Sequence, residues 1–167
     1  IGSSRIYDPN NAIGQALSQA IQPLLNHRTS EGLQIAKVDV QDIYDEFSYG
    51  RVDPAAIQAF LGYAFWSWPT RPGYVLLVCD GTYDFRGVSG TTLRNLNPPF
   101  LVNVDPFFGE VPADSRFVSV DPPVSGVDDY VPNMAIARLP AQTAIDVTNA
   151  VTKILAYEAS AGGSWQS

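Results

Sequence analysis

The stretch Tyr74-Val-Leu-Leu-Val-Cys-Asp-Gly81 decides the fold class, because five apolar residues from Val75 to Cys79 end abruptly at Asp80. A continuous apolar run of this length is typical of a strand covered on both faces, as in the parallel sheet of an α/β domain. Ligands of open α/β sheets bind beyond the carboxyl ends of the strands, which is where Asp80 falls. The only cysteine of the chain therefore lies beside the edge at which such a domain carries its site.

The segments around this strand predict one α/β unit over residues 1–167, in which a mostly parallel sheet forms the middle of three layers and helices flank it. We expect helices from about residue 11 to Gly32 (with a kink or restart at Pro23), at 41–47, at 53–68 and at 140–158, where Gly162-Gly163 ends the last one. Strands are expected at 33–40, 74–79 and 134–139. Residues 85–132 are rich in Gly, Pro, Asn and Asp and predict an irregular or hairpin insertion, with short strands at 100–104 and 116–120.

Composition excludes several classes of protein. A hydrophobic content of 46% with 16% charged residues is typical of a folded domain with a core. The net charge of −7 disfavours nucleic acid as a partner, because phosphate binding needs clustered Lys and Arg. No apolar stretch is long enough to span a membrane. The chain begins Ile1-Gly2-Ser3 without an initiator methionine, which indicates a piece of a longer protein.

Cys79 is the first catalytic candidate, and the sequence argues against it. A nucleophilic cysteine needs a base within hydrogen-bond reach, usually a histidine. The one histidine, His27, lies near the end of the first predicted helix, which packs on a sheet face and need not reach the edge beside Cys79. We therefore interpret Cys79 as a small buried apolar residue and His27 as a surface residue at a helix C-terminus. One cysteine and one histidine do not build a usual zinc site, and the motifs of serine hydrolases, P-loops and dinucleotide-binding folds are absent.

Acidic residues are the remaining candidates. Asp80 and Asp84 flank a tight loop, and five further aspartates lie in the irregular region: Asp105, Asp114, Asp121, Asp128 and Asp129. Calcium takes carboxylate and carbonyl oxygens from such loops, although the EF-hand spacing is absent, so Asp80 and Asp84 are weak calcium candidates. The simpler interpretation is that these aspartates form turns and helix caps. A small α/β enzyme that uses two carboxylates at the Asp80/Asp84 edge is a third, weaker possibility.

Six blocks along the chain go beyond fold class. They are Arg28-Thr-Ser-Glu-Gly32, Val38-Asp-Val-Gln-Asp-Ile-Tyr-Asp-Glu-Phe-Ser-Tyr-Gly50, Asp53-Pro-Ala-Ala-Ile57, Tyr74–Gly81, Met134-Ala-Ile-Ala-Arg-Leu-Pro140 and Lys153-Ile-Leu-Ala-Tyr-Glu158. In this order and spacing, over roughly residues 21–158, they resemble the gingipain-type cysteine peptidases, which have a caspase-like fold. Two positions depart from the family pattern, since Cys79 and Ala137 stand where the family usually has glycine.

The resemblance implies a parent endopeptidase in which a histidine-assisted thiolate attacks a peptide carbonyl. In that family the catalytic His and Cys lie in a second α/β subdomain, C-terminal to the helix that Lys153–Glu158 closes. It therefore implies that this chain is a noncatalytic N-terminal subdomain without a catalytic residue or required cofactor, calcium being possible as a structural ion. The implied partners are the catalytic subdomain in cis and a protein substrate, and the implied location is extracellular or the cell surface. The alternative is a noncatalytic binding or structural module of a surface protein, which the stretch following residue 167 would distinguish.

Overall fold

The computed structural model describes residues 12–84, 88–90, 95–107, 109–123 and 130–160, which form an α/β domain. None of the described helices is both long and apolar enough to cross a membrane. The elements are α1 (Ala12–Ser30), α2 (Val40–Ser48), α3 (Pro54–Ser67), β1 (Tyr74–Val78), β2 (Leu101–Asp105), β3 (Gly109–Pro112), the 3₁₀ helix η1 (Asp114–Val118), β4 (Ala135–Leu139) and α4 (Ala144–Ala159).

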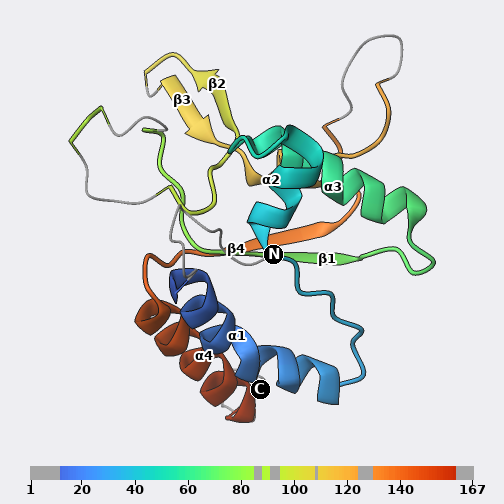
Figure 1. The fold of residues 1–167 in the computed structure, drawn as a ribbon, viewed down its shortest axis with the longest axis vertical. Coiled ribbons are helices and arrows are strands. Elements are labelled where there is room, and N and C mark those ends of the chain that lie inside the picture. The colour runs from blue at the N-terminus through green and yellow to red at the C-terminus, as the bar shows by residue number, and fades with distance from the viewer. Residues whose placement is uncertain (1–11, 85–87, 91–94, 108, 124–129, 161–167) are drawn as a thin grey trace, which may run out of the picture.

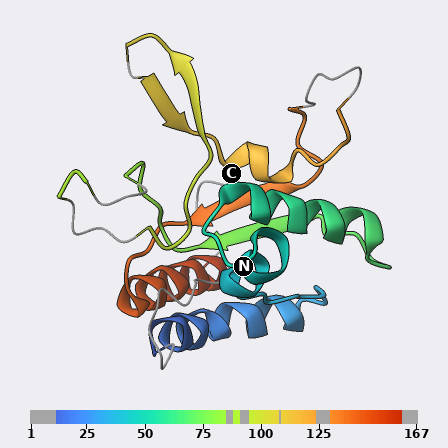
Figure 2. The same ribbon diagram turned by 45° about the horizontal axis from the view of Figure 1, so that its top comes forward.

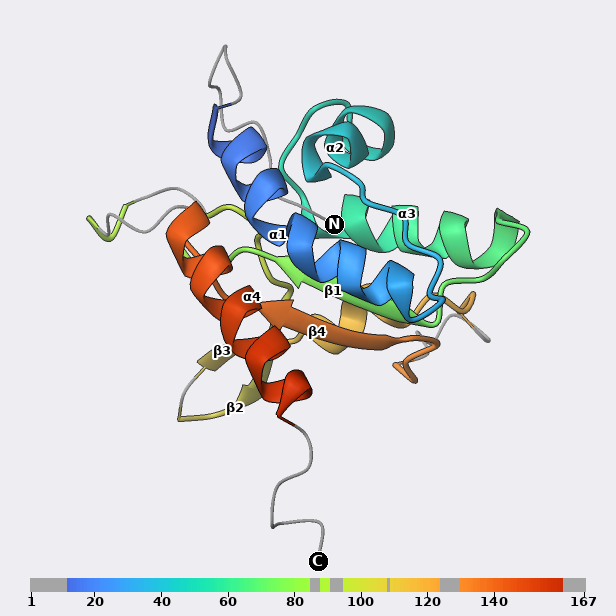
Figure 3. The same ribbon diagram turned by 90° about the horizontal axis from the view of Figure 1, so that it is seen from below.

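The strands β1 and β4 form a parallel pair in the middle of the molecule, with Val78 opposite Leu139. Helices α2 and α3 lie on one face of this pair, and α1 and α4 lie side by side on the other (Figures 1 and 3). Successive side chains of a strand point to opposite faces. Leu77 therefore packs in a core with α2, α3 and η1, whereas Val78 packs in a second core with α1 and α4.

The expected sheet is larger than the observed one. The described strands form two small sheets, the parallel pair β1–β4 and the antiparallel pair β2–β3, instead of one mostly parallel sheet in the middle of three layers. The strand predicted at 33–40 is wrong: this segment is irregular up to a single bridge at Asp39. The apolar side chains of Leu33 and Ile35 in this segment are 47% and 39% exposed, so strand pairing here would bury little apolar surface. The ammonium group of Lys37 donates a hydrogen bond to the hydroxyl of Ser18 in α1.

The insertion contains the predicted hairpin, formed by β2 and β3, which projects from the body of the domain (Figure 2). The second short strand, predicted at 116–120, is wrong, because η1 occupies this position and buries Phe117 and Val118 against α3. The side chain of Gln58 in α3 donates to the carbonyls of Arg116 and Ser119, which holds η1 in place. Residues 85–87, 91–94, 108 and 124–129 of the insertion lie outside the described residues.

Local sequence signals fix most of the helix ends. Asp53 caps α3 by accepting from the amide of Ala55, as the Asp-Pro sequence predicts. α1 runs through Pro23 without a restart, because Ile21 and Leu24 on either side are both buried in the core with α4. α4 begins at Ala144, later than predicted, behind a capping box in which Thr143 and Asp146 bond each other's backbone amides. The expected stop at Gly162-Gly163 lies outside the described residues.

Candidate functional site

Cys79 lies directly after β1, where the sequence places it, and its side chain is fully buried. Its φ angle is 88°, a backbone conformation that suits glycine and that other residues rarely adopt. The left-handed turn brings Val78 and Cys79 into the same core, the one formed with α1 and α4, although neighbouring strand residues normally face opposite sides. The glycine that the family resemblance places here is therefore explained by a positive φ, which a small side chain tolerates only with strain.

Arg138 of β4 connects the ends of four segments at this edge. Its guanidinium donates to both carboxylate oxygens of Asp114 at 2.7 Å, in a bidentate pair with η1. It also donates to the backbone carbonyls of Cys79 at 3.1 Å and Asn97 at 2.7 Å. The side chain is only 14% exposed, and a planar fork of donors is what such an arrangement requires. We call this the Arg138 hub.

The loop that follows Cys79 is bound to residues 95–99 through its backbone. The carbonyl of Asp80 accepts from the amides of Leu96 and Asn97, at 3.1 and 3.0 Å. Gly81 lies against this segment so closely that a Cβ atom on it would overlap the carbonyl oxygen of Asn97 and lie 2.6 Å from Cδ of Pro99. The space beyond the carboxyl end of β1 is therefore occupied by residues 95–99 of the same chain.

Two buried polar side chains lack a hydrogen-bond partner in the described part of the chain. They are the fully buried carboxamide of Asn97 and the hydroxyl of Tyr44 in α2. Burial raises the pKa of the Tyr44 phenol well above its usual value, the charge of Asp53 adds to this, and the charge of Arg138 opposes it. The Tyr44 hydroxyl is therefore neutral throughout the physiological pH range.

The two weak calcium candidates act as local acceptors. Both carboxylate oxygens of Asp84 accept from backbone amides, those of Val88 at 2.9 Å and Ser89 at 2.7 Å. Oδ1 of Asp80 accepts from the amide of Gly81 at 2.9 Å. Neither aspartate belongs to a cluster of three metal-ligating side chains within the described residues. This geometry favours their interpretation as turn-forming residues.

Calcium is accordingly expected to leave the melting temperature of the chain unchanged, because its binding would have to displace backbone hydrogen bonds of Asp84. Differential scanning fluorimetry over a calcium titration measures this directly. A calcium-dependent rise in melting temperature that Asp84→Asn abolishes would contradict the expectation and establish a site.

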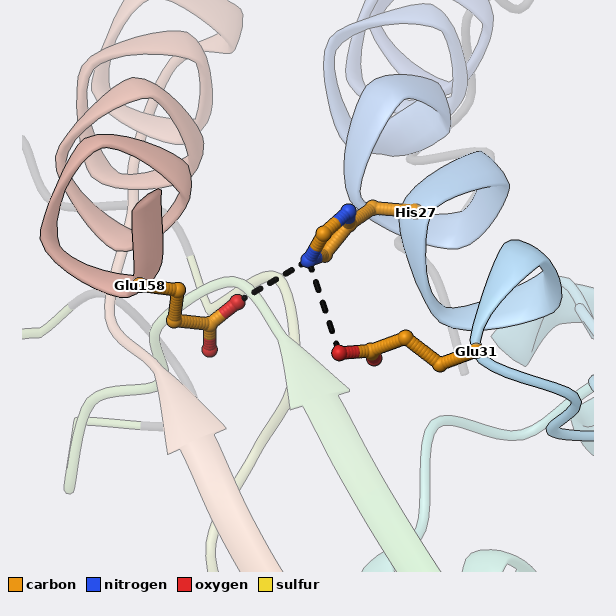
Figure 4. Close-up of side chains that lie close together, drawn as sticks. All are labelled: His27, Glu31 and Glu158. Atoms are coloured by element: carbon orange, nitrogen blue, oxygen red, sulfur yellow. Dashed lines mark ion pairs between the residues drawn. The ribbon is translucent and has the colours of Figure 1, made fainter. Parts of the chain in front are cut away.

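His27 lies at the end of α1 beside two carboxylates, and its ring contacts Glu31 and Glu158 rather than Cys79 (Figure 4). Its neighbour Arg28 donates to Glu31 and to both oxygens of Glu158 in α4. This hydrogen bonding lowers the pKa of Glu158 and raises that of Arg28. Two of the blocks that carry the family resemblance, Arg28–Gly32 and Lys153–Glu158, therefore meet in space as an ion pair between the first and last helices.

Sequence reasoning singled out the thiol and the aspartates at this edge but missed Arg138 and Asn97. A signal for Arg138 was present: a charged residue inside an otherwise apolar strand, between Ile136 and Leu139, needs a buried partner. No local pattern distinguishes Asn97 from the other asparagines of the insertion. In chemical terms, the edge holds a fully buried thiol and an arginine engaged in structural hydrogen bonds, while the one histidine of the chain lies elsewhere, beside two carboxylates.

The strain at Cys79 gives a testable order of stabilities. We expect Cys79→Gly to be more stable than Cys79→Ala by about 1 kcal/mol, because glycine adopts a φ of 88° without the 1–2 kcal/mol penalty of a Cβ. Urea unfolding of both variants measures the difference. At an ordinary strand position glycine is less stable than alanine. Ala137→Gly in β4 is therefore the control, and it should lower the free energy of unfolding by roughly 0.5–1 kcal/mol. Equal or lower stability of Cys79→Gly relative to Cys79→Ala would contradict the strain.

Comparison with known proteins places these features in one family. A search of curated proteins finds no match. Among solved structures, the chain is similar to dimeric latent PorU from Porphyromonas gingivalis, with a TM-score of 0.69 and 25% sequence identity over 86% of this chain. It spans 15% of the length of that PorU chain. The model of the family described as "Peptidase family C25" matches residues 8–167. The chain therefore belongs to peptidase family C25, the gingipain family of cysteine peptidases.

Proposed function

We propose that this chain is a noncatalytic N-terminal subdomain of a gingipain-like cysteine endopeptidase, and that it supports the catalytic subdomain of its parent. The proposal rests on the edge of β4 that faces away from β1. Within the parallel ladder, the amides and carbonyls of Ala135 and Leu139 face β1, as the bonds from Ala135 to Gly73 and from Cys79 to Leu139 indicate. The alternation of the ladder then turns the backbone groups of Ile136 away from β1, together with those of Arg138.

No hydrogen bond reaches these outward backbone groups from any described residue. Parallel sheets are normally buried and extended by further strands, and a strand–helix pair such as β4–α4 normally continues into a neighbouring parallel strand. A strand supplied by the rest of the parent would complete the sheet at β4. The 15% share of the matched PorU chain is consistent with a parent much larger than this domain.

Hydrogen exchange tests this placement. In a longer chain that includes the next subdomain, the amides of Ile136 and Arg138 should exchange much more slowly than in residues 1–167 alone. The amide of Ala137 faces β1 in the register and serves as the internal control, since its exchange should change little. Unchanged exchange at all three positions would exclude a strand added at β4 and favour the binding or structural module.

In the proposed parent, a histidine-assisted thiolate attacks the peptide carbonyl and expels the amine, and water then hydrolyses the acyl-enzyme. None of the described residues of this chain provides that pair, because the Cys79 thiol is fully buried and the His27 ring lies against carboxylates. Membership of a family of peptidases related to gingipains supports an extracellular or surface location for the parent.

We expect purified residues 1–167 to show no turnover of peptide substrates, because the Cys79 thiol is fully buried and the one histidine of the chain lies against carboxylates. A fluorogenic peptide library with basic, acidic and apolar residues before the cleavage site measures this. Turnover that Cys79→Ala abolishes would overturn the noncatalytic assignment. Turnover equal in both proteins would identify a contaminating peptidase and leave the assignment standing.

A further inference from the structure

Three side chains converge where α1 and α4 end, and we call them the helix-end cluster: His27, Glu31 and Glu158. His27 lies in the last turn of α1, Glu31 follows the helix four residues later, and Glu158 comes from the last turn of α4. Each offers one ligand atom, and these atoms all lie within 4.8 Å of one another. Figure 4 shows the imidazole and the two carboxylates turned toward a common point.

The two distances from the imidazole to the carboxylates suit a metal ion better than a hydrogen bond. Nε2 of His27 lies 3.3 Å from Oε2 of Glu158 and 3.6 Å from Oε1 of Glu31, beyond the usual N–H···O range of about 2.7–3.2 Å. Zinc binds nitrogen at about 2.0–2.1 Å and oxygen at about 2.0–2.2 Å, so two ligands of a tetrahedral ion lie roughly 3.3–3.5 Å apart. The two separations are close to the edges of that tetrahedron. The imidazole has no other side-chain partner in the described part of the chain.

Arg28 holds the two carboxylates from outside the cluster. It donates to Oε2 of Glu31, whose other oxygen faces the imidazole, and to both oxygens of Glu158. Oε2 of Glu158, 3.0 Å from Nη1 of Arg28, also faces the imidazole and has a lone pair left for an ion. Such a partner around the metal ligands fixes their orientation and restricts the side-chain freedom that binding would otherwise remove. With a neutral imidazole, the two carboxylates and Arg28 give a net charge of −1, which attracts a cation in a chain of net charge −7.

We propose that His27, Glu31 and Glu158 form a zinc site that joins α1 to α4. One nitrogen and two oxygens are a donor set that divalent zinc accepts, with water in the fourth position. The sequence argued against zinc because it counted only one cysteine and one histidine, but two carboxylates, Glu31 just after α1 and Glu158 in α4, supply the missing ligands. The ion would attach the first helix of the domain to the last. This inference does not depend on the proposed peptidase function.

The single histidine of the chain makes the test direct, provided that no histidine tag remains. Zinc is added to ¹⁵N-labelled residues 1–167, and the imidazole nitrogen signals are followed, all of which belong to His27. We expect a saturable shift of the Nε2 resonance with one equivalent of zinc, a matching stoichiometry by calorimetry, and no shift with magnesium, which disfavours imidazole. Absence of any zinc-dependent shift would overturn the proposal.

Two variants separate a built site from scattered binding to an acidic surface. Glu158→Gln and His27→Gln should each weaken zinc binding roughly tenfold or more, whereas the exposed acid Glu110 in β3 provides the matched control and Glu110→Gln should leave it unchanged. Circular dichroism confirms that each variant is folded before titration. If zinc binds all four proteins equally, the cluster is an ion-pair network only, and the proposal is wrong.

Discussion

Replacing Arg138 with methionine is expected to lower the free energy of unfolding by about 3 kcal/mol, which is the largest effect of any charge removal in the domain. Methionine keeps the apolar stem but leaves the carboxylate of Asp114 and the carbonyls of Cys79 and Asn97 without their donor. Arg138→Lys should recover only part of the loss, since an ammonium group cannot make the bidentate pair together with both carbonyl contacts. Urea unfolding of the two variants provides the values.

The control for Arg138 is Arg51, whose side chain is 79% exposed and lies 3.8 Å from Asp53. Arg51→Met should change stability by no more than about 0.5 kcal/mol, as expected for an exposed ion pair. Hydrogen exchange adds a local readout, because loss of the Arg138 hub should speed exchange at Leu96 and Asn97, whose amides are bonded to Asp80. Similar losses of stability in the Arg138 and Arg51 variants would mean that the Arg138 hub does not hold these segments together.

Gly81→Ala adds only one methyl group, but we expect it to lower the free energy of unfolding by roughly 3 kcal/mol or more. The new Cβ would overlap the carbonyl oxygen of Asn97 and come within 2.6 Å of Cδ of Pro99. Both atoms belong to the backbone or to a proline ring, so neither moves aside by a change of rotamer. The loop must shift, and the bonds from Leu96 and Asn97 to Asp80 are then lost.

Gly73→Ala is the matched control, because nothing lies within 4 Å of a Cβ at Gly73 and its φ is not positive. Alanine there should be neutral or stabilising by up to about 1 kcal/mol, since it restricts the unfolded chain. Thermal and urea unfolding of both variants compare the two glycines directly. A Gly81→Ala protein as stable as Gly73→Ala would show that residues 95–99 do not pack against the turn as described.

Much of the local structure could be predicted from the sequence, because its causes are local. The apolar run from Val75 to Val78 is found as β1, and Asp53-Pro54 begins α3 through a side-chain cap and a preset φ. The first strand of the hairpin, β2, overlaps the run predicted at 100–104, whereas its second strand, β3, lies at Gly109–Pro112 and not at the predicted 116–120. The predictions failed in segments whose secondary structure is determined by tertiary contacts. Residues 33–38 have strand-like composition, and η1 replaces a strand because Gln58 binds its carbonyls.

At the candidate site the division is similar. The sequence placed Cys79 at the end of a buried strand and argued correctly that its thiol lies inside, because a continuous apolar run has no exposed face. Only the tertiary structure decided that Cys79 adopts a positive φ, that Arg138 bonds four segments together, and that His27 meets Glu158 across two helices. Periodicity and caps act between neighbours in sequence, whereas these contacts depend on how distant elements pack, which the sequence does not state residue by residue.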